Sequence, residues 1–372
     1  MGKDLCGFVY GSLRLGKGDI RKKEMLKGHK MALERLLGAL ETRGYLFPEC
    51  RLKRDDTGDL CLLGQGASGI VYEMQDVEGK SFALKVIGLG NYILEPDNFY
   101  DLAEEYCKIS NDNEGIIHII DAKEWIVKEG DGERIFVREI GEQYEKEEGI
   151  ILQFVLLEYL KVVLSKDGKA VYLQREQLRD EMEICILGMQ IGKALSFLHE
   201  RDYVHRDVKL ENIYWDENNL CYKLGDLDTM ERTGDGINTL SVYTDGYAAP
   251  EIRGKEMICY DKTADIYSLG ICMYLLLNEL RFPASSGYFV DSEQYSENYA
   301  FPKPDNASEK LICVIQKMCS YNKKDRYQSM EEVVDAIQKV MQEKKEESVL
   351  IFIENSDGME FTAWIPKMDR PA

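Results

Sequence analysis

Five stretches between about residues 51 and 159 place apolar residues in short continuous or alternating runs, separated by polar and glycine-rich positions. In chain order they are LCLLGQGASGIVYEM, KSFALKVIGL, IIHIIDAKEWIVK, ERIFVREI and IILQFVLLEY. Runs of this length and period predict β-strands. One further run, FYDLAEEYCKIS, lies between the second and third stretches and repeats its apolar residues at helical spacing. This part of the chain therefore predicts a sheet of short strands that carries one helix.

After Leu160 the apolar spacing becomes mainly helical. We expect a long helix from about Arg175 to Glu200, another near Thr263 to Asn278, and others up to Glu343. A strand-rich part followed by a helix-rich part is typical of an α+β fold with two lobes. The expected division is an N-terminal extension 1–50, a β-rich lobe 51–160, a helical lobe 161–345 and a C-terminal extension 346–372.

Both extensions are expected to contain structure of their own. Leucines recur at helical spacing between Met31 and Leu40, which predicts a helix that docks on the main domain; the alternative is a regulatory or partner-binding arm. The final segment, SVLIFIENSDGMEFTAWIP, predicts two short strands around an Asp-Gly turn. Because a lone hairpin is only marginally stable in water, it must dock on another surface.

The formal net charge of the chain is −20. A protein that binds nucleic acid without sequence preference needs a basic surface, so this charge argues against a nucleic-acid partner. A basic protein substrate would be attracted instead, although acidity is also a general aid to solubility.

Cysteine usage indicates the compartment. The chain has ten cysteines without a CxxC pair and only four histidines, which predicts free thiols in the cytoplasm rather than disulfides or a zinc site. The longest apolar run, from Ile150 to Leu160, is too short and too interrupted to span a bilayer. We therefore expect a cytoplasmic protein without a membrane span.

The first candidate for chemistry is GQGASGIVYE, which contains Gly64, Gly66 and Gly69. Glycines allow a turn between two strands to approach phosphates and to point backbone N–H groups at them. The alternatives are a tight hairpin without a ligand and a dinucleotide site. A dinucleotide site requires a helix after the glycines, whereas IVYEM continues as a strand.

The second candidate is Lys85 in FALKVI, sixteen residues after Gly69. Lysine is rarely buried without a partner, so a lysine in an apolar strand indicates anionic partners. The alternative is a lysine whose ammonium group reaches solvent from a half-exposed strand. At this distance from the glycines, pairing with phosphate is the favoured interpretation.

The third and fourth candidates are HRDVKLEN, from His205 to Asn212, and KLGDLD. In the first, Asp207, Lys209 and Asn212 supply a proton acceptor, a cation for a transferred phosphoryl group and a metal ligand. In the second, Asp226 follows Asp207 by nineteen residues, at the end of an expected strand, where a carboxylate can bind magnesium.

Four motifs in this order resemble the eukaryotic-type protein kinase superfamily. The resemblance extends from about Gly64 to Arg326 and includes YAAPE, which ends at Glu251, and DIYSLG, which starts at Asp265. It implies a bilobal protein kinase-like fold with a small β-rich N-lobe that carries one helix and a larger α-helical C-lobe. It also implies a pair between Glu251 and Arg326.

The resemblance implies ATP and Mg²⁺ as cofactors. The segment from Gly64 to Val71, with Gln65, Gly66 and Gly69, would cover ATP, and Val71 and Ala83 would sandwich adenine. Lys85 would hold the α- and β-phosphates. Leu157 would be the gatekeeper, Glu158 to Leu160 would bind adenine through the backbone, and Tyr214 would lie beneath it.

For catalysis, the resemblance implies that Asp207 accepts or orients the proton of the substrate hydroxyl. Lys209 would contact the γ-phosphate, and Asn212 and Asp226 would hold magnesium. Lys209 together with Thr244 matches the serine/threonine pattern rather than the tyrosine pattern, so the substrate is expected to be a protein hydroxyl of that class.

The resemblance also implies a regulatory site. Arg206 precedes the catalytic aspartate, so a phosphate on the activation segment could pair with it and order the loop. Thr239 and Ser241 are the candidate phosphorylation sites by their spacing before Thr244. The alternative is that both are solvated loop hydroxyls.

The sequence departs from the family pattern at a few positions. Glu104 is the predicted partner of Lys85, with Glu105 as the alternative register, and Tyr214 could crowd the adenine pocket. The family's DFG reads Asp226-Leu227-Asp228 here, which removes a permissive glycine and adds a charge near the metal. A pseudokinase scaffold is therefore the alternative to an active protein kinase. A small-molecule kinase of related fold is a third possibility, but YAAPE and Thr244 count against it.

Overall fold

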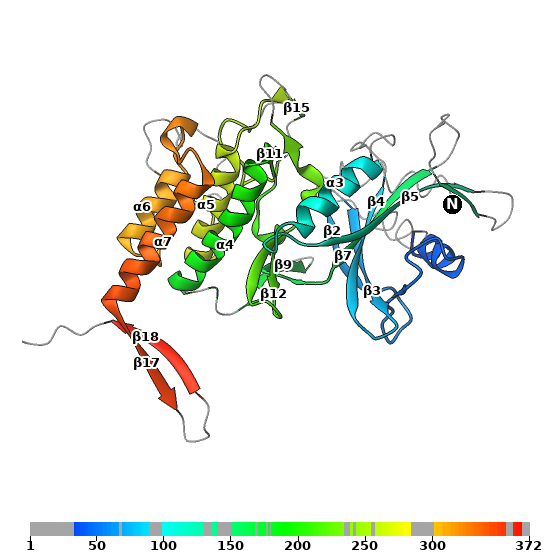
Figure 1. Ribbon diagram of the computed structural model, residues 1–372, viewed down its shortest axis with the longest axis horizontal. Coiled ribbons are helices and arrows are strands. Elements are labelled where there is room, and N and C mark those ends of the chain that lie inside the picture. Colours follow the sequence, from blue (N-terminus) through cyan, green and yellow to red (C-terminus); the bar gives the residue numbers. More distant parts are fainter. Residues whose placement is uncertain are drawn as a thin grey trace, which may run out of the picture. The chain divides into compact units, whose positions relative to one another are not determined.

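In the computed structural model the chain forms two compact units, Met1–Leu160 and Lys161–Ala372. Figure 1 colours the chain from blue at its start to red at its end. The described residues are 33–66, 69–88, 99–129, 135–139, 150–167, 170–175, 178, 180–233, 239–240, 243–253, 257–283, 301–354 and 360–366.

The N-terminal unit is built on an antiparallel sheet of seven strands. The strands are β1 (Cys50–Leu52), β2 (Leu62–Gly66), β3 (Gly69–Asp76), β4 (Ser81–Gly88), β5 (Ile119–Glu129), β6 (Ile135–Glu139) and β7 (Ile150–Glu158). They run in the order β1-β3-β4-β7-β5-β6, and β2 pairs with β3 (Figure 1). Helix α3 (Phe99–Asn111) packs against β5. The predicted sheet with one helix is therefore confirmed.

The two faces of this sheet differ because side chains alternate along a strand. One face contributes a hydrophobic core made by Ile70, Tyr72, Met74, Leu84, Val86, Leu152, Phe154 and Leu156. The intervening residues point to the other face, and there Val71 lies opposite Lys85 in the ladder between β3 and β4. Ala83 lies on the same face, opposite Leu157 of β7. Val71, Ala83 and Lys85, which were predicted to contact the nucleotide, thus share the face that the core leaves unused.

A helix over residues 33–42 belongs to this core. Four of its leucines are buried there: Leu33, Leu36, Leu37 and Leu40. The segment that follows is tied to β5, because Trp125 Nε1 donates to the carbonyl of Tyr45 at 2.9 Å and Lys123 Nζ donates to the carbonyl of Leu46 at 3.0 Å. The Glu41 carboxylate accepts the N–H of Leu52 at 2.5 Å. The helix is therefore an integral part of the N-terminal unit.

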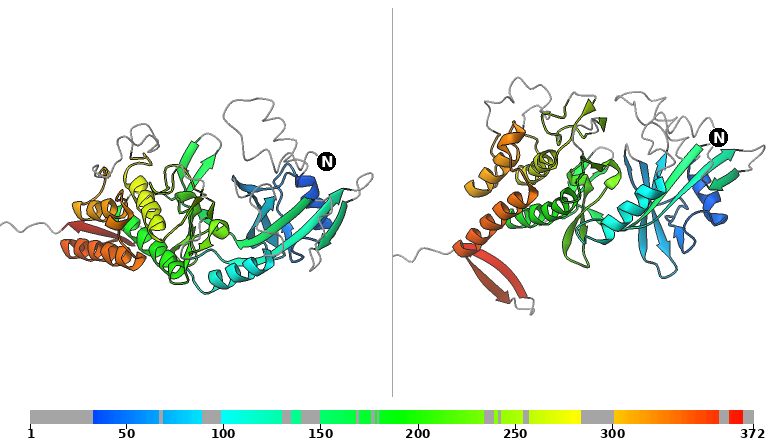
Figure 2. Two further views of the ribbon diagram at one scale, coloured as in Figure 1. Left: turned by 90° about the horizontal axis from the view of Figure 1, so that it is seen from above. Right: turned by 45° about the horizontal axis from the view of Figure 1, so that its top comes forward.

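The C-terminal unit is mostly helical. Its helices are α4 (Glu181–His199), α5 (Thr263–Leu277), α6 (Glu309–Met318) and α7 (Met330–Glu347), with 3₁₀ turns η2 (Leu210–Asn212), η3 (Leu227–Thr229) and η4 (Lys323–Asp325). Figures 1 and 2 show the four α-helices packed beside one another. Every residue of α5 is buried, because this helix is apolar around most of its circumference.

Short strands complete the unit. β8 (Lys161–Val162), β12 (Ile213–Asp216) and β13 (Cys221–Leu224) form a three-stranded sheet in the order β13-β12-β8. The remaining pairs are β9 (Leu164–Asp167) with β10 (Ala170–Leu173), β11 (Tyr203–Val204) with β14 (Glu231–Arg232), β15 (Thr239–Leu240) with β16 (Met257–Ile258), and β17 (Ser348–Glu354) with β18 (Glu360–Pro366). The last pair is the predicted hairpin, which follows α7 (Figure 2); its predicted turn at Asp357-Gly358 lies outside the described residues.

The long helix begins later than the sequence indicated. We expected it from about Arg175, but α4 begins at Glu181. Asp180 caps it, since its carboxylate accepts the N–H groups of Met182 at 2.7 Å and Glu183 at 3.3 Å. An aspartate at this position satisfies helix N–H groups that have no partner within the helix, so the helix starts there. Within the described residues no helix is both long and apolar enough to cross a membrane.

The buried helix predicts a stability effect. Leu37 is 0% exposed, so Leu37→Ala should lower the free energy of unfolding by about 2–5 kcal/mol because it leaves a cavity. Arg35→Ala, on the exposed side of the same helix, should change it by less than about 0.5 kcal/mol. Urea unfolding of both variants measures the difference, and equal midpoints would show that the helix does not stabilise the sheet.

Candidate active site

The glycine motif forms the hairpin between β2 and β3. Gly66 lies opposite Gly69 and Gly64 opposite Val71, while Ala67 and Ser68 are outside the described residues. Gly69 has φ 149°, and a Cβ there would lie 2.4 Å from the carbonyl oxygen of Val86, so only glycine fits. At Gly64 an added Cβ would meet no described atom within 4 Å. None of the described residues therefore crowds Gly64. The strand after the glycines excludes the dinucleotide interpretation.

Lys85 lies on the sheet face opposite the hydrophobic core, beside Val71 and on the same face as Ala83. The residue is only 7% exposed. A buried ammonium group is costly without anionic or polar partners, and it has less freedom than a solvent-exposed lysine. The strand register therefore brings together the lysine and the two small apolar residues that the sequence singled out in this half of the chain.

The two glutamates of α3 face different ways. Glu104 is 69% exposed and bonds Lys108 one turn later at 2.7 Å. That hydrogen bond lowers the pKa of Glu104 from its ordinary value. Glu105 is half-buried and lies one turn before Ile109, which is 5% exposed. Because residues four apart share a helix face, Glu105 lies on the buried side of α3 and Glu104 on the solvent side.

The end of β7 is fixed by two hydrogen bonds between Glu158 and His118. The N–H of Glu158 donates to the carbonyl of His118 at 3.1 Å, and the Glu158 carboxylate accepts the N–H of His118 at 2.8 Å. Tyr159 and Leu160 follow outside any strand, and Leu160 is the last residue of the N-terminal unit. Leu157, the predicted gatekeeper, lies opposite Ala83.

In the C-terminal unit Asp207, Lys209 and Thr244 form a closed set of polar contacts. Lys209 Nζ lies 2.5 Å from Asp207 Oδ2 and donates to Thr244 Oγ1 at 3.1 Å. Thr244 Oγ1 in turn donates to Asp207 Oδ1 at 2.6 Å. Asp207 is 9% exposed. A carboxylate, an ammonium group and a hydroxyl are therefore locked in one orientation, although Thr244 is remote from the other two in sequence.

Asn212 and Asp226 lie at one end of the hairpin formed by β12 and β13. The N–H of Gly225 donates to the carbonyl of Asn212 at 2.9 Å, directly before the first strand pair, Ile213 with Leu224. Asp226 has the left-handed backbone conformation (φ 62°, ψ 63°), which aspartate tolerates better than most residues.

These two side chains fit a magnesium ion. Asn212 is 5% exposed, and its Nδ2 donates to the carbonyl of Asp207 at 2.9 Å. With the amide nitrogen committed to the loop, Oδ1 is the atom of Asn212 suited to coordination. An amide oxygen and a carboxylate, here supplied by Asn212 and Asp226, are among the hard ligands that Mg²⁺ prefers.

Asp265 fixes the loop that carries Asp207. It is 1% exposed, and its carboxylate accepts the N–H groups of His205 at 2.9 Å and Arg206 at 3.0 Å. His199 Nε2 lies 2.9 Å from the same carboxylate. Burial raises the pKa of Asp265, but the hydrogen bonds and charges of His199 and His205 lower it, and the pKa is lowered overall. An ionised Asp265 can therefore hold Arg206 at φ 70°.

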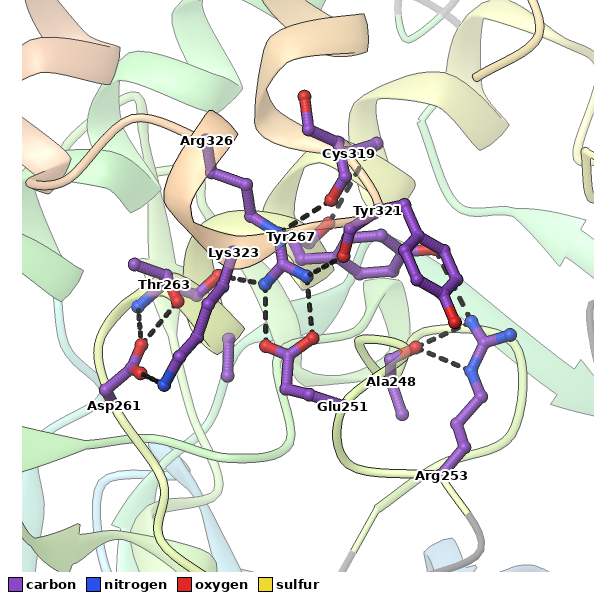
Figure 3. Close-up of polar contacts among 12 residues, drawn as sticks. Ala248, Glu251, Arg253, Asp261, Thr263, Tyr267, Cys319, Tyr321, Lys323 and Arg326 are labelled. Carbon is purple, nitrogen blue, oxygen red and sulfur yellow. Dashed lines mark hydrogen bonds and ion pairs between the residues drawn. The ribbon is translucent and has the colours of Figure 1, made fainter. Parts of the chain in front are cut away.

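Arg326 and Glu251 form the pair that the resemblance implied. Arg326 is 2% exposed, and its two terminal nitrogens donate to the two Glu251 oxygens at 2.8 and 2.6 Å (Figure 3). The same guanidinium group donates to the carbonyls of Ser320, Thr263 and Tyr321. This prediction is confirmed, and the pair ties the segment before α5 to the segment before α7.

Tyr214 is half-buried in β12, opposite Val162 and Lys223. Thr239 contributes only its backbone, in β15, to the described structure, and Ser241 lies outside it.

Two contacts were not predicted. His199 supports Asp265 from the last turn of α4, and Glu231 forms an ion pair with Arg206. A histidine in the last turn of a helix and a glutamate in a strand of two residues carry no local signal for these roles.

Comparison with known proteins matches residues 59–336 to the protein kinase domain family. MAP kinase-activated protein kinase 2 of Homo sapiens is 33% identical over 153 residues, which are 38% of this chain and 38% of that protein. Cell cycle serine/threonine-protein kinase CDC5/MSD2 of Saccharomyces cerevisiae is 24% identical over 280 residues, 74% of this chain and 35% of that protein. The chain spans less than half the length of either relative.

Burial predicts that the Glu251–Arg326 ion pair contributes much more to stability than the Asp261–Lys323 ion pair; both are drawn in Figure 3. Glu251→Gln should destabilise the chain by about 3–5 kcal/mol, because it leaves a buried guanidinium group without its carboxylate. Lys323→Ala removes the more exposed pair with Asp261 and should cost about 1 kcal/mol or less. Thermal unfolding distinguishes the two variants, and similar losses would contradict the importance of burial.

Proposed function

We propose that this chain, which belongs to the protein kinase domain family, transfers the γ-phosphoryl group of ATP to serine and threonine hydroxyls of protein substrates. The observation that carries the proposal is the closed set of contacts among Asp207, Lys209 and Thr244. This set offers a proton acceptor and a cation at one point, in an orientation held by a hydroxyl. Phosphoryl transfer depends mainly on such positioning and charge neutralisation.

In this proposal Asp207 orients the substrate hydroxyl and accepts its proton. Lys209 neutralises charge on the phosphoryl group during transfer, and Thr244 keeps the Asp207 carboxylate and the Lys209 ammonium group aligned. The contact of Thr244 with both groups supports the serine/threonine class, since the sequence at these positions matches that pattern. Asp265 acts only as a positioning residue, through the backbone of the loop.

The family pattern supplies the assignment of the nucleotide-binding residues. Gly64, Gln65, Gly66 and Gly69 would cover the phosphates with backbone N–H groups, and Val71 and Ala83 would contact adenine, as would the backbone from Glu158 to Leu160 and the side chain of Tyr214. Lys85 would hold the α- and β-phosphates. The common face of Val71, Ala83 and Lys85 supports this assignment, as does Gly64, which none of the described residues crowds.

Magnesium would supply charge neutralisation to the ATP phosphates, held by Asn212 and Asp226. The engaged amide nitrogen of Asn212 supports its oxygen as a ligand. We also propose a basic protein substrate, because the net charge is −20. A cytoplasmic location is supported by free thiols on the nine cysteines that the structure describes.

A nucleotide-binding scaffold without efficient transfer is the second candidate. It is favoured by the sequence Asp226-Leu227-Asp228, in which Leu227 is 5% exposed and fills the apolar position but an aspartate replaces the family's glycine. An additional carboxylate beside the metal ligand could weaken productive magnesium binding. The complete set of Asp207, Lys209, Asn212 and Asp226 makes the active enzyme our first choice.

Transfer of labelled phosphate from ATP tests the function. With magnesium, wild type should label itself and a generic basic protein on serine or threonine, whereas Asp207→Asn should lower the rate about 10²- to 10⁴-fold. Asp335→Asn, an exposed aspartate on α7, is the matched control and should retain the wild-type rate. No transfer by wild type despite measurable ATP binding would make the scaffold the better description.

The orientation of α3 makes a second prediction for this function. We propose Glu105, rather than Glu104, as the carboxylate that supports Lys85, because Glu105 lies on the buried side of the helix. Glu105→Gln should lower kcat/KM for ATP about 10- to 100-fold, the loss expected for one charge-assisted hydrogen bond. Glu104→Gln should change it less than about twofold, as expected for an exposed ion pair. A larger loss of kcat/KM in Glu104→Gln than in Glu105→Gln would instead identify Glu104 as the partner of Lys85.

A further inference from the structure

Arg206, next to the proposed catalytic aspartate, is enclosed by groups of its own chain. Its side chain is 9% exposed, and its Nε donates to the carbonyl of Thr229 at 2.6 Å. One terminal nitrogen forms an ion pair with the carboxylate of Glu231. The guanidinium group also lies over the ring of Tyr260, 5.0 Å from its centroid. A buried guanidinium group requires an opposite charge, and Glu231 supplies one.

Glu231 is held in place by the short ladder between β11 and β14. In that ladder Glu231 lies opposite Val204, two residues before Arg206. Its neighbour Arg232 donates from Nε to the hydroxyl of Tyr203 at 2.7 Å. At the end of the strand the N–H of Thr233 donates to the carbonyl of Asp202 at 2.6 Å. The carboxylate is therefore presented to Arg206 by fixed backbone rather than by a mobile side chain alone.

The charge balance at Arg206 bears on regulation. The sequence indicated that a phosphate on the activation segment, here residues 226–251, could pair with this arginine. A phosphate carries about −1.5 to −2 charges at neutral pH, and beside the Glu231 carboxylate it would meet like-charge repulsion. It would also have to share a cation that already has a carboxylate partner. The gain in order from phosphorylation is therefore smaller than it would be at an arginine without such a partner.

We propose that Glu231 is a built-in counter-charge for Arg206, so that the start of the activation segment is ordered without phosphorylation. The inference rests on the proposed kinase activity and names the regulation of that site. Glu231 acts as a positioning residue, because its carboxylate pairs with Arg206 in the loop that carries Asp207 and its backbone pairs with Val204. Loss of its charge should lower kcat and leave KM for ATP nearly unchanged.

The test compares wild type, Glu231→Gln, Glu231→Asp and the control Glu217→Gln after phosphatase treatment, with mass spectrometry to verify removal of phosphate. Glu217 also forms an ion pair with a basic side chain, that of Lys161 at 2.7 Å, but its side chain is 62% exposed and lies in the turn between β12 and β13. Wild type and Glu217→Gln should keep their rates within about twofold of the untreated protein. Glu231→Gln should lose about tenfold in kcat, a change of about 1.4 kcal/mol, and Glu231→Asp should recover part of it.

Loss of wild-type activity on dephosphorylation would overturn the proposal, as would a Glu231→Gln variant that matches Glu217→Gln. Hydrogen exchange provides a readout that does not depend on transfer. Backbone amides of residues 229–233 should exchange faster in Glu231→Gln than in wild type and Glu217→Gln, and unchanged exchange would also overturn the proposal. If wild type transfers no phosphate before or after treatment, the proposed function fails, and the exchange result still decides whether Glu231 orders the segment.

Discussion

The carboxylate of Asp265 is the contact on which the proposed catalytic loop depends. It lies in the first turn of a helix whose every residue is buried, and it accepts two consecutive backbone N–H groups, those of His205 and Arg206. Buried N–H groups without partners are costly, so removing this acceptor would affect the fold as well as the loop. The same two hydrogen bonds fix the backbone conformation of the loop. From this backbone the side chain of Asp207 points toward Lys209 and that of Arg206 toward Glu231.

In the N-terminal unit the alternation of side chains along the strands separates the core face of the sheet from the face that carries Lys85. One face of its sheet is covered by the leucines of the helix at 33–42 and closes a hydrophobic core. The other face is thereby left for Val71, Ala83 and Lys85, which the registers of β3, β4 and β7 place together. Because alternation has a period of two, a shift of one residue in any of these strands would exchange the faces. Packing of an N-terminal helix and presentation of the lysine are therefore parts of one arrangement.

Much of the fold was predictable because it follows local patterns. The strands of the first half, the helix at Phe99–Asn111 and the C-terminal hairpin each have a clear period, and α5 is a continuous apolar helix. The start of α4 was misplaced because helical spacing continued upstream of Asp180, the residue that actually caps the helix. The strands β9 and β10 were missed because each is only four residues long and is stabilised by its partner rather than by its own pattern.

The sequence by itself determined which groups are available for chemistry, since the glycines, Lys85, Asp207, Asn212 and Asp226 stand in motifs whose spacing is local. It also determined the pairing of Glu251 with Arg326 through the family resemblance. Only the tertiary structure decided which glutamate of α3 faces solvent, which carboxylate meets Arg206, and that His199 supports Asp265 across 66 residues of chain. The physical reason is that local periodicity sets the direction of a side chain along its own element, whereas its partner is chosen by the packing of distant elements.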